Sequence, residues 1–415
     1  MNETLTESTP PTQPPTQVCV VGLGYIGLPT AAVLASRGFA VHGVEVNPDA
    51  VKIINGGRAH IVEPDLDMLV QAGVATGRLR AHVDVAPADV FVLCVPTPLT
   101  GGRSDRPRPD LSYVEKAGDV IAPHVAAGNL VVLESTSPPG TTERLAERLR
   151  EQSGLGDALH VVHAPERVLP GHILREVVEN DRIVGGVDAA STAAGVAFYE
   201  RFVRGAILQT TASTAEAAKL TENAFRDVNI AFANELSQMS ETLGLDVWEL
   251  IRLANRHPRV NILRPGPGVG GHCIAVDPYF LVDAAPDDTT LIATARAVNR
   301  AKPGAVIGRV LAAAERFKRP VVACMGLAYK PDIDDLRESP ALDIVRALKE
   351  RLGGGLRVVE PNLASHDDFE LASTADAVEA ADVVVFLVGH REFLTLKPST
   401  LAAKVVVDVC GVLEG

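Results

Sequence analysis

The chain has 415 residues, of which 47% are hydrophobic and 22% are charged, and its formal net charge is −13. This length favours two or three domains, and the composition is that of an ordinary globular protein. The acidic balance argues against a nucleic-acid partner, because binding a phosphate backbone requires a basic surface. It leaves room for a small phosphorylated ligand, which a few local cations and backbone N–H groups can hold.

The N-terminus and the cysteines bear on the compartment. Residues 1–17 are rich in Pro and Thr, without a basic start or an apolar stretch, so they predict a disordered tail rather than a signal peptide. No apolar run reaches about 18 residues, which predicts that the chain does not span a membrane. The five cysteines form no CxxC pair, which disfavours a disulfide framework and a zinc site. We therefore expect a reducing, cytoplasmic location and no metal.

The first part of the chain alternates between apolar runs and helical patterns. The runs lie at residues 18–22, 40–46, 90–95, 130–133, 159–163 and 182–187, and a helical pattern covers 25–37. Unbroken Val, Leu and Ile runs are typical of strands that are covered on both faces. This part predicts a doubly wound α/β domain with a parallel sheet.

The rest of the chain changes character twice. Residues 214–243 predict one long helix, followed by helical pieces through Leu253 and near 291–300, with the Gly- and Pro-rich segment RPGPGVGGHCIAVDP between them. Strand-like runs return at 321–326, 356–360, 382–388 and 405–409. Ser339 can cap a helix that begins at Pro340, because Pro suits the first helical position. We expect an α/β domain, a helical region and a second, smaller α/β domain.

A glycine fingerprint follows the first predicted strand. Gly22, Gly24 and Gly27 form GxGxxG before a predicted helix, and Glu45 ends the second strand. This context predicts that the backbone approaches a pyrophosphate at the N-terminus of the helix. Glu45 can accept hydrogen bonds from a ribose diol and would repel a 2′-phosphate, so the sequence favours NAD over NADP.

Thr97 and Thr136 follow two further predicted strands. The carboxyl ends of parallel strands meet at one edge of a sheet, so both side chains could reach the same cofactor. The alternative is that they are ordinary turn residues.

One cysteine differs from the other four. Cys19, Cys94, Cys324 and Cys410 lie in apolar runs and predict inert core residues. Cys273 instead follows two glycines and His272, shortly before Asp277. The glycines let a substrate come close, and a thiolate is a good nucleophile toward an aldehyde. A catalytic and a structural role for Cys273 both fit this pattern.

The long predicted helix carries three polar residues on one face. Lys219, Asn223 and Arg226 are spaced four and then three residues apart. An amide between two cations, close in sequence to a Gly-rich cysteine loop, indicates an anion or oxyanion site. A solvated helix face is the alternative.

Six segments together resemble the UDP-glucose/GDP-mannose dehydrogenase family, from Val18 to about Gly411. They are GLGYIGLPTA, NGGRAHIVEPDL, HAPERVLPGHIL, KLTENAFRDVNIAFANEL, NRHPRVNILRPGPGVGGHCIAVDP and GLAYKPDIDDLRESPALDI. The resemblance is strongest to the branch that acts on UDP-N-acetyl-D-mannosamine and serves polysaccharide biosynthesis. It implies two Rossmann-like domains joined by a long central helix: an NAD-binding domain (18–210), a central dimerisation and catalytic-loop domain (211–312) and a UDP-sugar-binding domain (313–415).

The resemblance also implies a reaction. Two successive NAD molecules take up the four electrons of oxidising the C6 alcohol to a carboxylate. Cys273 adds to the intermediate aldehyde as a thiohemiacetal, which is oxidised to a thioester and released by water. Lys219 exchanges protons and, with Asn223, stabilises the oxyanion, while Asp277 and Glu166 manage water and protons. The family's members are dimers or larger assemblies.

The same resemblance implies the binding residues. Those around the nucleotide sugar are Arg167, Val168, Lys219, Asn223, Arg226, His257, Arg259, Gly270, Tyr329 and Lys330, with His257 and Arg259 contributed by a neighbouring subunit. Those around NAD are Gly22, Gly24, Tyr25, Ile26, Gly27, Glu45, Thr97, Thr136 and Arg337.

Several positions bear on the substrate. His272 and Val276 match the branches that act on N-acetylated sugars, and the segments HPRVNI and CIAVDP favour mannosamine over UDP-N-acetyl-D-glucosamine. Glu45 stands where the family more often has aspartate. Three alternatives remain: the same reaction on UDP-N-acetyl-D-glucosamine, a two-electron hydroxyacid dehydrogenase, and a non-catalytic nucleotide-sugar sensor.

Overall fold

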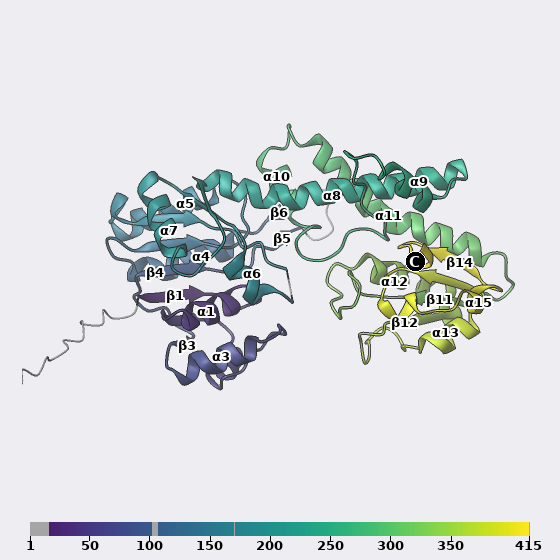
Figure 1. The fold of residues 1–415 in the computed structure, drawn as a ribbon, viewed down its shortest axis with the longest axis horizontal. Helices are drawn as coiled ribbons and strands as arrows, with labels where there is room; N and C mark the ends of the chain where they lie inside the picture. Colours follow the sequence, from purple (N-terminus) through teal and green to yellow (C-terminus); the bar gives the residue numbers. More distant parts are fainter. Residues whose placement is uncertain (1–15, 102–106, 170, 415) are drawn as a thin grey trace, which may run out of the picture. The chain divides into compact units, whose positions relative to one another are not determined.

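The computed structural model describes residues 16–101, 107–169 and 171–414, so most of the tail predicted over 1–17 lies outside the described residues. The chain divides into two compact units, Met1–Lys219 and Leu220–Gly415. Helix α8 (Ala212–Leu243) contributes residues to both, and Figure 1 shows it as one continuous helix. Among the described helices, none combines the length and apolar character that a membrane span requires.

The first unit contains an eight-stranded sheet in the order β10-β9-β8-β7-β4-β1-β2-β3. Its strands are β1 (Gln17–Val21), β2 (Ala40–Val44), β3 (Leu79–His82), β4 (Val90–Leu93), β7 (Leu130–Leu133), β8 (His160–His163), β9 (Arg182–Gly186) and β10 (Ile207–Thr211). A short hairpin, β5 (Leu99–Thr100) with β6 (Arg108–Pro109), lies outside this sheet. Beyond β1 the chain builds the sheet in one direction through β2 and β3, and then in the other direction from β4.

One part of the predicted sheet runs the other way. The strands from β3 to β8 form the parallel sheet that the sequence predicts, whereas β9 pairs with β8 in the antiparallel sense, and β10 follows β9 in parallel. Helix α6 (Ile173–Glu179), between β8 and β9, packs against α1 (Gly27–Ser36).

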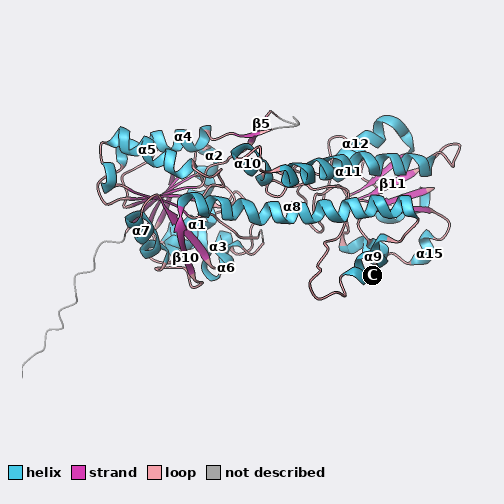
Figure 2. Cartoon of the chain, turned by 90° about the horizontal axis from the view of Figure 1, so that it is seen from above, coloured by secondary structure: helices cyan, strands magenta, loops and turns pink. Residues whose placement is uncertain are grey.

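Both faces of this sheet are buried, as the unbroken apolar runs predict. Val18 and Val20 of β1 belong to one core, whereas Cys19 and Val21 belong to the other. The first core is covered by α1, α2 (Pro48–Asn55), α3 (Leu66–Ala75), α6 and α7 (Ala189–Tyr199), and the second by α4 (Ser112–Ile121) and α5 (Thr141–Ser153). Figure 2 shows α4 and α5 on one side of the strands and α1 and α7 on the other.

The helical part of the second unit consists of α8, α9 (Val247–Ala254), α10 (Asp277–Ala284) and α11 (Thr290–Ala314). The prediction of a helix near 291–300 is too short, because α11 continues through Pro303. A proline inside a helix removes one backbone hydrogen bond. The buried residues Val306 and Val310 beyond it pack into the core of the second sheet, and this burial offsets the loss.

The second sheet is smaller and entirely parallel, in the order β12-β11-β13-β14. Its strands are β11 (Val322–Met325), β12 (Leu356–Val359), β13 (Val383–Phe386) and β14 (Val405–Asp408), with α12 (Pro340–Leu352), α13 (Thr374–Ala380), α14 (Arg391–Leu394) and α15 (Pro398–Leu401) around it. The predicted cap of α12 is confirmed, because Ser339 Oγ accepts the Leu342 N–H at 3.3 Å. The two α/β domains and the long helix are therefore as the sequence predicts.

Candidate active site

The three fingerprint glycines have distinct steric roles. A Cβ on Gly22, whose φ is +89°, would lie 2.6 Å from the Cys94 carbonyl oxygen, and one on Gly27 would lie 1.8 Å from the Gly22 oxygen. A Cβ on Gly24 would meet nothing within 4 Å. Two glycines are thus needed for close packing, while the third presents bare backbone to open space. This arrangement fits a pyrophosphate resting on the N-terminus of α1.

Glu45 is fixed at the end of β2. Its Oε2 accepts the Leu23 N–H at 3.2 Å, and its Oε1 accepts the Asn47 N–H at 3.0 Å. The side chain remains partly exposed beside the fingerprint turn. A carboxylate held in this way can accept hydrogen bonds from a ribose diol, so the residues present fit NAD.

Thr97 and Thr136 lie together. Thr97 Oγ1 donates a hydrogen bond to the Thr136 carbonyl oxygen at 2.8 Å. They follow β4 and β7, which are neighbours in the sheet, and β4 also pairs with β1. These two predicted cofactor residues therefore lie at the same sheet edge as the glycine turn, where the strand order reverses.

Glu166 belongs to a buried charge cluster in the first unit. Its Oε2 accepts a hydrogen bond from Arg182 Nη1 at 2.7 Å, and both side chains are almost fully buried. The Arg182 guanidinium also lies 5.0 Å from the ring centroid of Tyr199, whose hydroxyl donates to Glu134 at 2.9 Å. Burial raises the pKa of Glu134. Arg182 is not among the residues predicted from the sequence, although a cation at the start of a buried strand is a usable signal.

The cysteine loop in the second unit packs on Tyr329. A Cβ on Gly270 would lie 2.7 Å from Tyr329 Cβ, and one on Gly271, whose φ is +80°, would lie 2.8 Å from Tyr329 Cε2. The Gly271 N–H donates to the Arg337 carbonyl oxygen at 3.1 Å. The glycines before Cys273 thus allow the loop to approach the segment of predicted substrate and cofactor residues.

Cys273 lies in a turn directly before α10 and is partly exposed. Its carbonyl oxygen accepts the Asp277 N–H at 2.8 Å. The Asp277 carboxylate in turn accepts a hydrogen bond from Asn223 Nδ2 at 2.6 Å, and both side chains are buried. Cys273, Asn223 and Asp277 are therefore in one neighbourhood of the second unit, while Lys219 lies one turn before Asn223 on α8.

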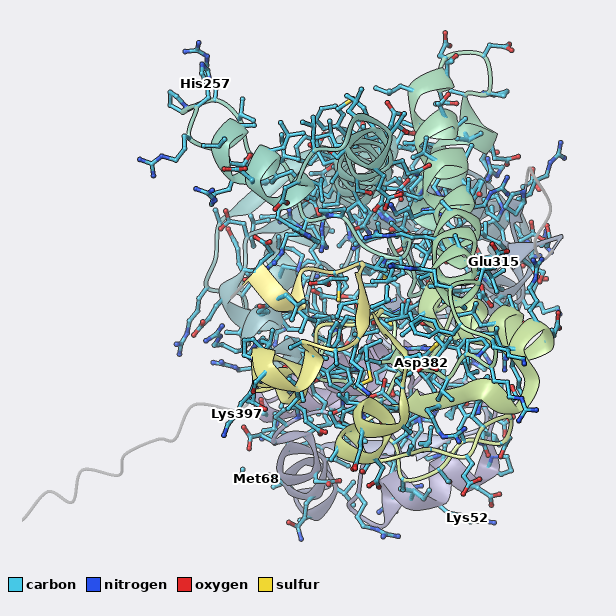
Figure 3. All side chains as sticks on the ribbon, turned by 90° about the vertical axis from the view of Figure 1, so that its right-hand side faces the viewer. Lys52, Met68, His257, Glu315, Asp382 and Lys397 are labelled. Atoms are coloured by element: carbon cyan, nitrogen blue, oxygen red, sulfur yellow. The ribbon has the colours of Figure 1, made fainter. Side chains whose placement is uncertain are left out.

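Two predicted residues lie in an exposed turn. His257 and Arg259 are exposed in the turn after α9, where the Arg259 N–H donates to His257 Nδ1 at 3.3 Å. Figure 3 shows His257 at the tip of this loop, pointing outward. Arg226 and Lys330 are also exposed, whereas Val168 packs against the core of the first unit.

A buried polar network holds the Gly- and Pro-rich loop, and the sequence analysis missed it. The Gly266 N–H donates to Asn234 Oδ1 at 2.9 Å, and Asn234 Nδ2 donates to Asn299 Oδ1 at 2.9 Å. Asn299 also donates to Asp227 Oδ1 at 2.8 Å, and Arg296 pairs with the same carboxylate oxygen at 2.5 Å. The available signal was the recurrence of polar residues on one face of each helix.

Three family models cover most of the chain. They are the NAD binding domain (residues 16–203), the central domain (213–301) and the UDP binding domain (323–415) of the UDP-glucose/GDP-mannose dehydrogenase family.

Relatives and solved structures agree with these matches. The NDP-N-acetyl-D-galactosaminuronic acid dehydrogenase of Ralstonia nicotianae is 56% identical over 95% of each chain. The UDP-N-acetyl-D-mannosamine dehydrogenase of Campylobacter jejuni is 50% identical over 92% of this chain and 97% of its own. The structure of the UDP-D-ManNAc dehydrogenase from Pyrococcus horikoshii matches with a TM-score of 0.87 and 41% identity, over 95% of this chain and 96% of that one. The chain belongs to the UDP-glucose/GDP-mannose dehydrogenase family and is an NAD-dependent nucleotide-sugar dehydrogenase.

Proposed function

We propose that this enzyme oxidises C6 of UDP-N-acetyl-D-mannosamine to a carboxylate and uses Cys273 as a covalent nucleophile. The observation that carries the proposal is the hydrogen bond between Asn223 and Asp277, at 2.6 Å. It joins the polar face of α8 to the turn that contains Cys273. This link supports a role for the Asn223 amide in stabilising an oxyanion formed at Cys273. Within this proposal, residues 18–210, 211–312 and 313–415 act as the cofactor, central and sugar-nucleotide domains.

The first oxidation takes the alcohol to an aldehyde. NAD is the hydride acceptor in both oxidations, and Lys219 accepts the proton of the C6 hydroxyl. The Cys273 sulfur then forms a bond to the aldehyde carbon, and the carbonyl π electrons move to the oxygen. Asn223 has a second N–H hydrogen besides the one directed at Asp277, and it can stabilise this oxyanion together with the Lys219 ammonium.

The second oxidation takes the thiohemiacetal to a thioester. Water then adds to the thioester carbon, the carbon–sulfur bond breaks, and the acid leaves. In this proposal Glu166, whose carboxylate pairs with Arg182 at 2.7 Å, accepts a proton from this water. In total, one sugar consumes one water and yields two NADH. Covalent capture keeps the reactive aldehyde on the enzyme between the two oxidations.

UDP-N-acetyl-D-galactosamine is a second candidate substrate. The UDP-N-acetyl-D-mannosamine dehydrogenases of Campylobacter jejuni, Yersinia pestis and Escherichia coli are 48–50% identical, whereas the NDP-N-acetyl-D-galactosaminuronic acid dehydrogenases of Ralstonia are 56% identical. This difference favours UDP-N-acetyl-D-galactosamine as the alternative substrate. Both sugars present a 2-acetamido group and a C6 hydroxyl, so the proposed chemistry is the same for each.

The substrate is tested by measuring kcat/KM and NADH yield with the UDP-linked mannosamine, galactosamine and glucosamine N-acetyl sugars. We expect the highest kcat/KM with the mannosamine sugar and two NADH per sugar consumed. A higher kcat/KM with either of the others would overturn the substrate assignment and leave the mechanism standing. One NADH per sugar would overturn the mechanism.

We also propose that the enzyme is a homodimer or a larger homo-oligomer built on α8. Phe225, Phe232 and Met239 are spaced seven residues apart on this helix and are 68%, 51% and 41% exposed. This spacing places them on one face, where a second copy could bury them. In such an assembly the exposed His257 and Arg259 would reach the sugar nucleotide of the neighbouring subunit.

A further inference from the structure

Helices α5 and α8 cap each other at their N-termini, which both belong to the first unit. Glu216 of α8 is fully buried, and its carboxylate accepts four hydrogen bonds from the start of α5. The donors are Ser137 Oγ (3.2 Å), Gly140 N–H (2.7 Å), Thr142 N–H (2.8 Å) and Thr142 Oγ1 (2.6 Å). All four donors lie in the short segment between β7 and the first turn of α5.

The exchange is reciprocal. Glu143, in the first turn of α5, accepts hydrogen bonds from Ser213 of α8 through its N–H at 3.2 Å and its Oγ at 2.5 Å. The first N–H groups of a helix have no partner within the helix and carry partial positive charge. Two such ends would repel each other, so each helix supplies a carboxylate to the other. The N-cap residue of α5, Gly140, has no side chain to do this itself.

This junction joins two parts of the active site. The segment that Glu216 holds begins directly after Thr136, whose carbonyl oxygen accepts the Thr97 hydrogen bond at the cofactor edge. The helix that carries Glu216 also carries Lys219, about 4.5 Å further along the helix axis. Glu216 therefore lies between the cofactor loop and the proposed proton-transfer residue, and all of these residues belong to the first unit.

We propose that Glu216 is a positioning residue, which holds the Lys219 turn of α8 against the cofactor loop 136–140. This inference rests on the role proposed above for Lys219. Glu216 is fully buried, so it acts through these neighbours rather than on a reactant. It fixes the distance between the side chain that accepts the hydroxyl proton and the edge where NAD binds. NAD affinity and turnover therefore depend on this carboxylate, whereas UDP binding to the second unit does not.

The test is the variant Glu216→Gln, which keeps the length of the side chain but turns one acceptor into a donor facing other donors. We expect KM for NAD to rise about tenfold and kcat to fall by a similar factor, because at least one buried hydrogen bond is lost. The Kd for UDP, measured by calorimetry, should stay within about twofold of the parent value. Glu147→Gln, on an exposed position of α5, is the matched control and should leave all three constants unchanged.

Parent values of KM and kcat in Glu216→Gln would overturn the inference. Equal losses of NAD and UDP binding would also overturn it, because they indicate a role in general stability. If this variant does not fold, Thr142→Val removes one donor and keeps the shape of the side chain. It should raise KM for NAD about threefold without changing the Kd for UDP, and parent constants would again contradict the inference.

Lys219→Ala, assayed in parallel, distinguishes a failure of the proposed role of Lys219 from a failure of the inferred role of Glu216. Acid formation at the parent rate by Lys219→Ala would remove the proposed role of Lys219. An inactive Lys219→Ala beside an unaffected Glu216→Gln would remove only the role of Glu216.

Discussion

Glu45 and Glu360 occupy equivalent positions in the two sheets. Each follows the second strand of its sheet and accepts the N–H of the leucine that follows the first strand's glycine: Leu23 at 3.2 Å for Glu45, and Leu327 at 2.7 Å for Glu360. They differ in what else they contact. Glu360 is buried against His390 Nε2 at 3.0 Å, whereas Glu45 remains partly exposed.

The environment of Glu360 makes it a structural residue. Burial opposes its ionisation, but hydrogen bonds from His390 and from backbone N–H groups outweigh this and lower the pKa of Glu360 to about 2. Its carboxylate accepts hydrogen bonds from backbone N–H groups in the loop after β11. The carboxylate of the first sheet remains partly exposed and available for the proposed ribose contact, while that of the second holds the loop that leads to Tyr329.

This difference predicts that the same Glu→Gln substitution affects cofactor binding in the first sheet and stability in the second. Glu45→Gln should raise KM for NAD about tenfold and reduce the discrimination against NADP, because the repulsion of a 2′-phosphate is lost. Glu360→Gln should lower the thermal midpoint and leave KM for NAD at the parent value. Steady-state kinetics with both cofactors checks this, and an unchanged KM in Glu45→Gln would refute the ribose contact.

Arg182 compensates the buried carboxylate of Glu166 and faces Glu134 nearby. Replacing it by methionine leaves these buried acids without a cation, so Arg182→Met should lower the free energy of unfolding by about 3–5 kcal/mol. Arg148→Met is the control: it removes a half-exposed ion pair with Asp119 and should cost less than about 1 kcal/mol. Urea unfolding of both variants provides the comparison. Equal losses would show that the buried cluster has no special energetic role.

Lys302 gives a prediction about pH. It is buried on α11 and donates to Ser237, and burial lowers the pKa of Lys302 from 10.5 to about 8. The unfolded chain therefore binds the proton more tightly, so the ammonium destabilises the fold below pH 8. This destabilisation is relieved as the pH rises from about 8 to 10.5. Glu241 and Arg309 are the charged groups that act on it.

Lys302→Met should consequently be more stable than the parent at pH 7, by an amount on the order of 3 kcal/mol. The gap should narrow as the pH rises toward 10.5. Denaturant unfolding of both proteins across this range measures the difference. A gap that stays constant with pH would contradict a depressed pKa at this position.

Much of the fold could be predicted from local sequence. Val18 and Cys19 face opposite cores, and an unbroken apolar run requires just this arrangement. The direction of β9 could not be predicted, because the apolar residues of a strand buried on both faces fit a parallel and an antiparallel neighbour alike. The length of α11 was missed for a related reason: the burial of Val306 overrides the local effect of Pro303.

The candidate site also contains residues that local sequence predicts and contacts that it cannot predict. Gly24, Glu45 and Cys273 can be found in the sequence because their chemistry requires particular neighbours along the chain. The partners Asn223 and Asp277 are far apart in sequence, and a spacing argument cannot show that they meet. The sequence offers Lys219, Asn223 and Arg226 as one helix face, yet in the structure Asn223 is buried and Arg226 is exposed.

Subunit exchange tests the proposed contribution of Arg259 to a neighbouring site. Cys273→Ser and Arg259→Ala should each be inactive or nearly so as pure proteins. Mixed dimers should contain one intact site in two, so an equal mixture should regain about a quarter of the parent activity after exchange. If the mixture shows only the average of its two components, Arg259 acts within its own subunit.

Acid formation by Cys273→Ser, compared with the parent enzyme at saturating NAD and UDP-N-acetyl-D-mannosamine, tests the covalent mechanism most directly. The variant should still bind the sugar nucleotide. Chromatography of its products should show no uronic acid, because an alcohol cannot replace the thiolate in capturing the aldehyde. Uronic acid produced by the variant at the parent rate would contradict the covalent mechanism.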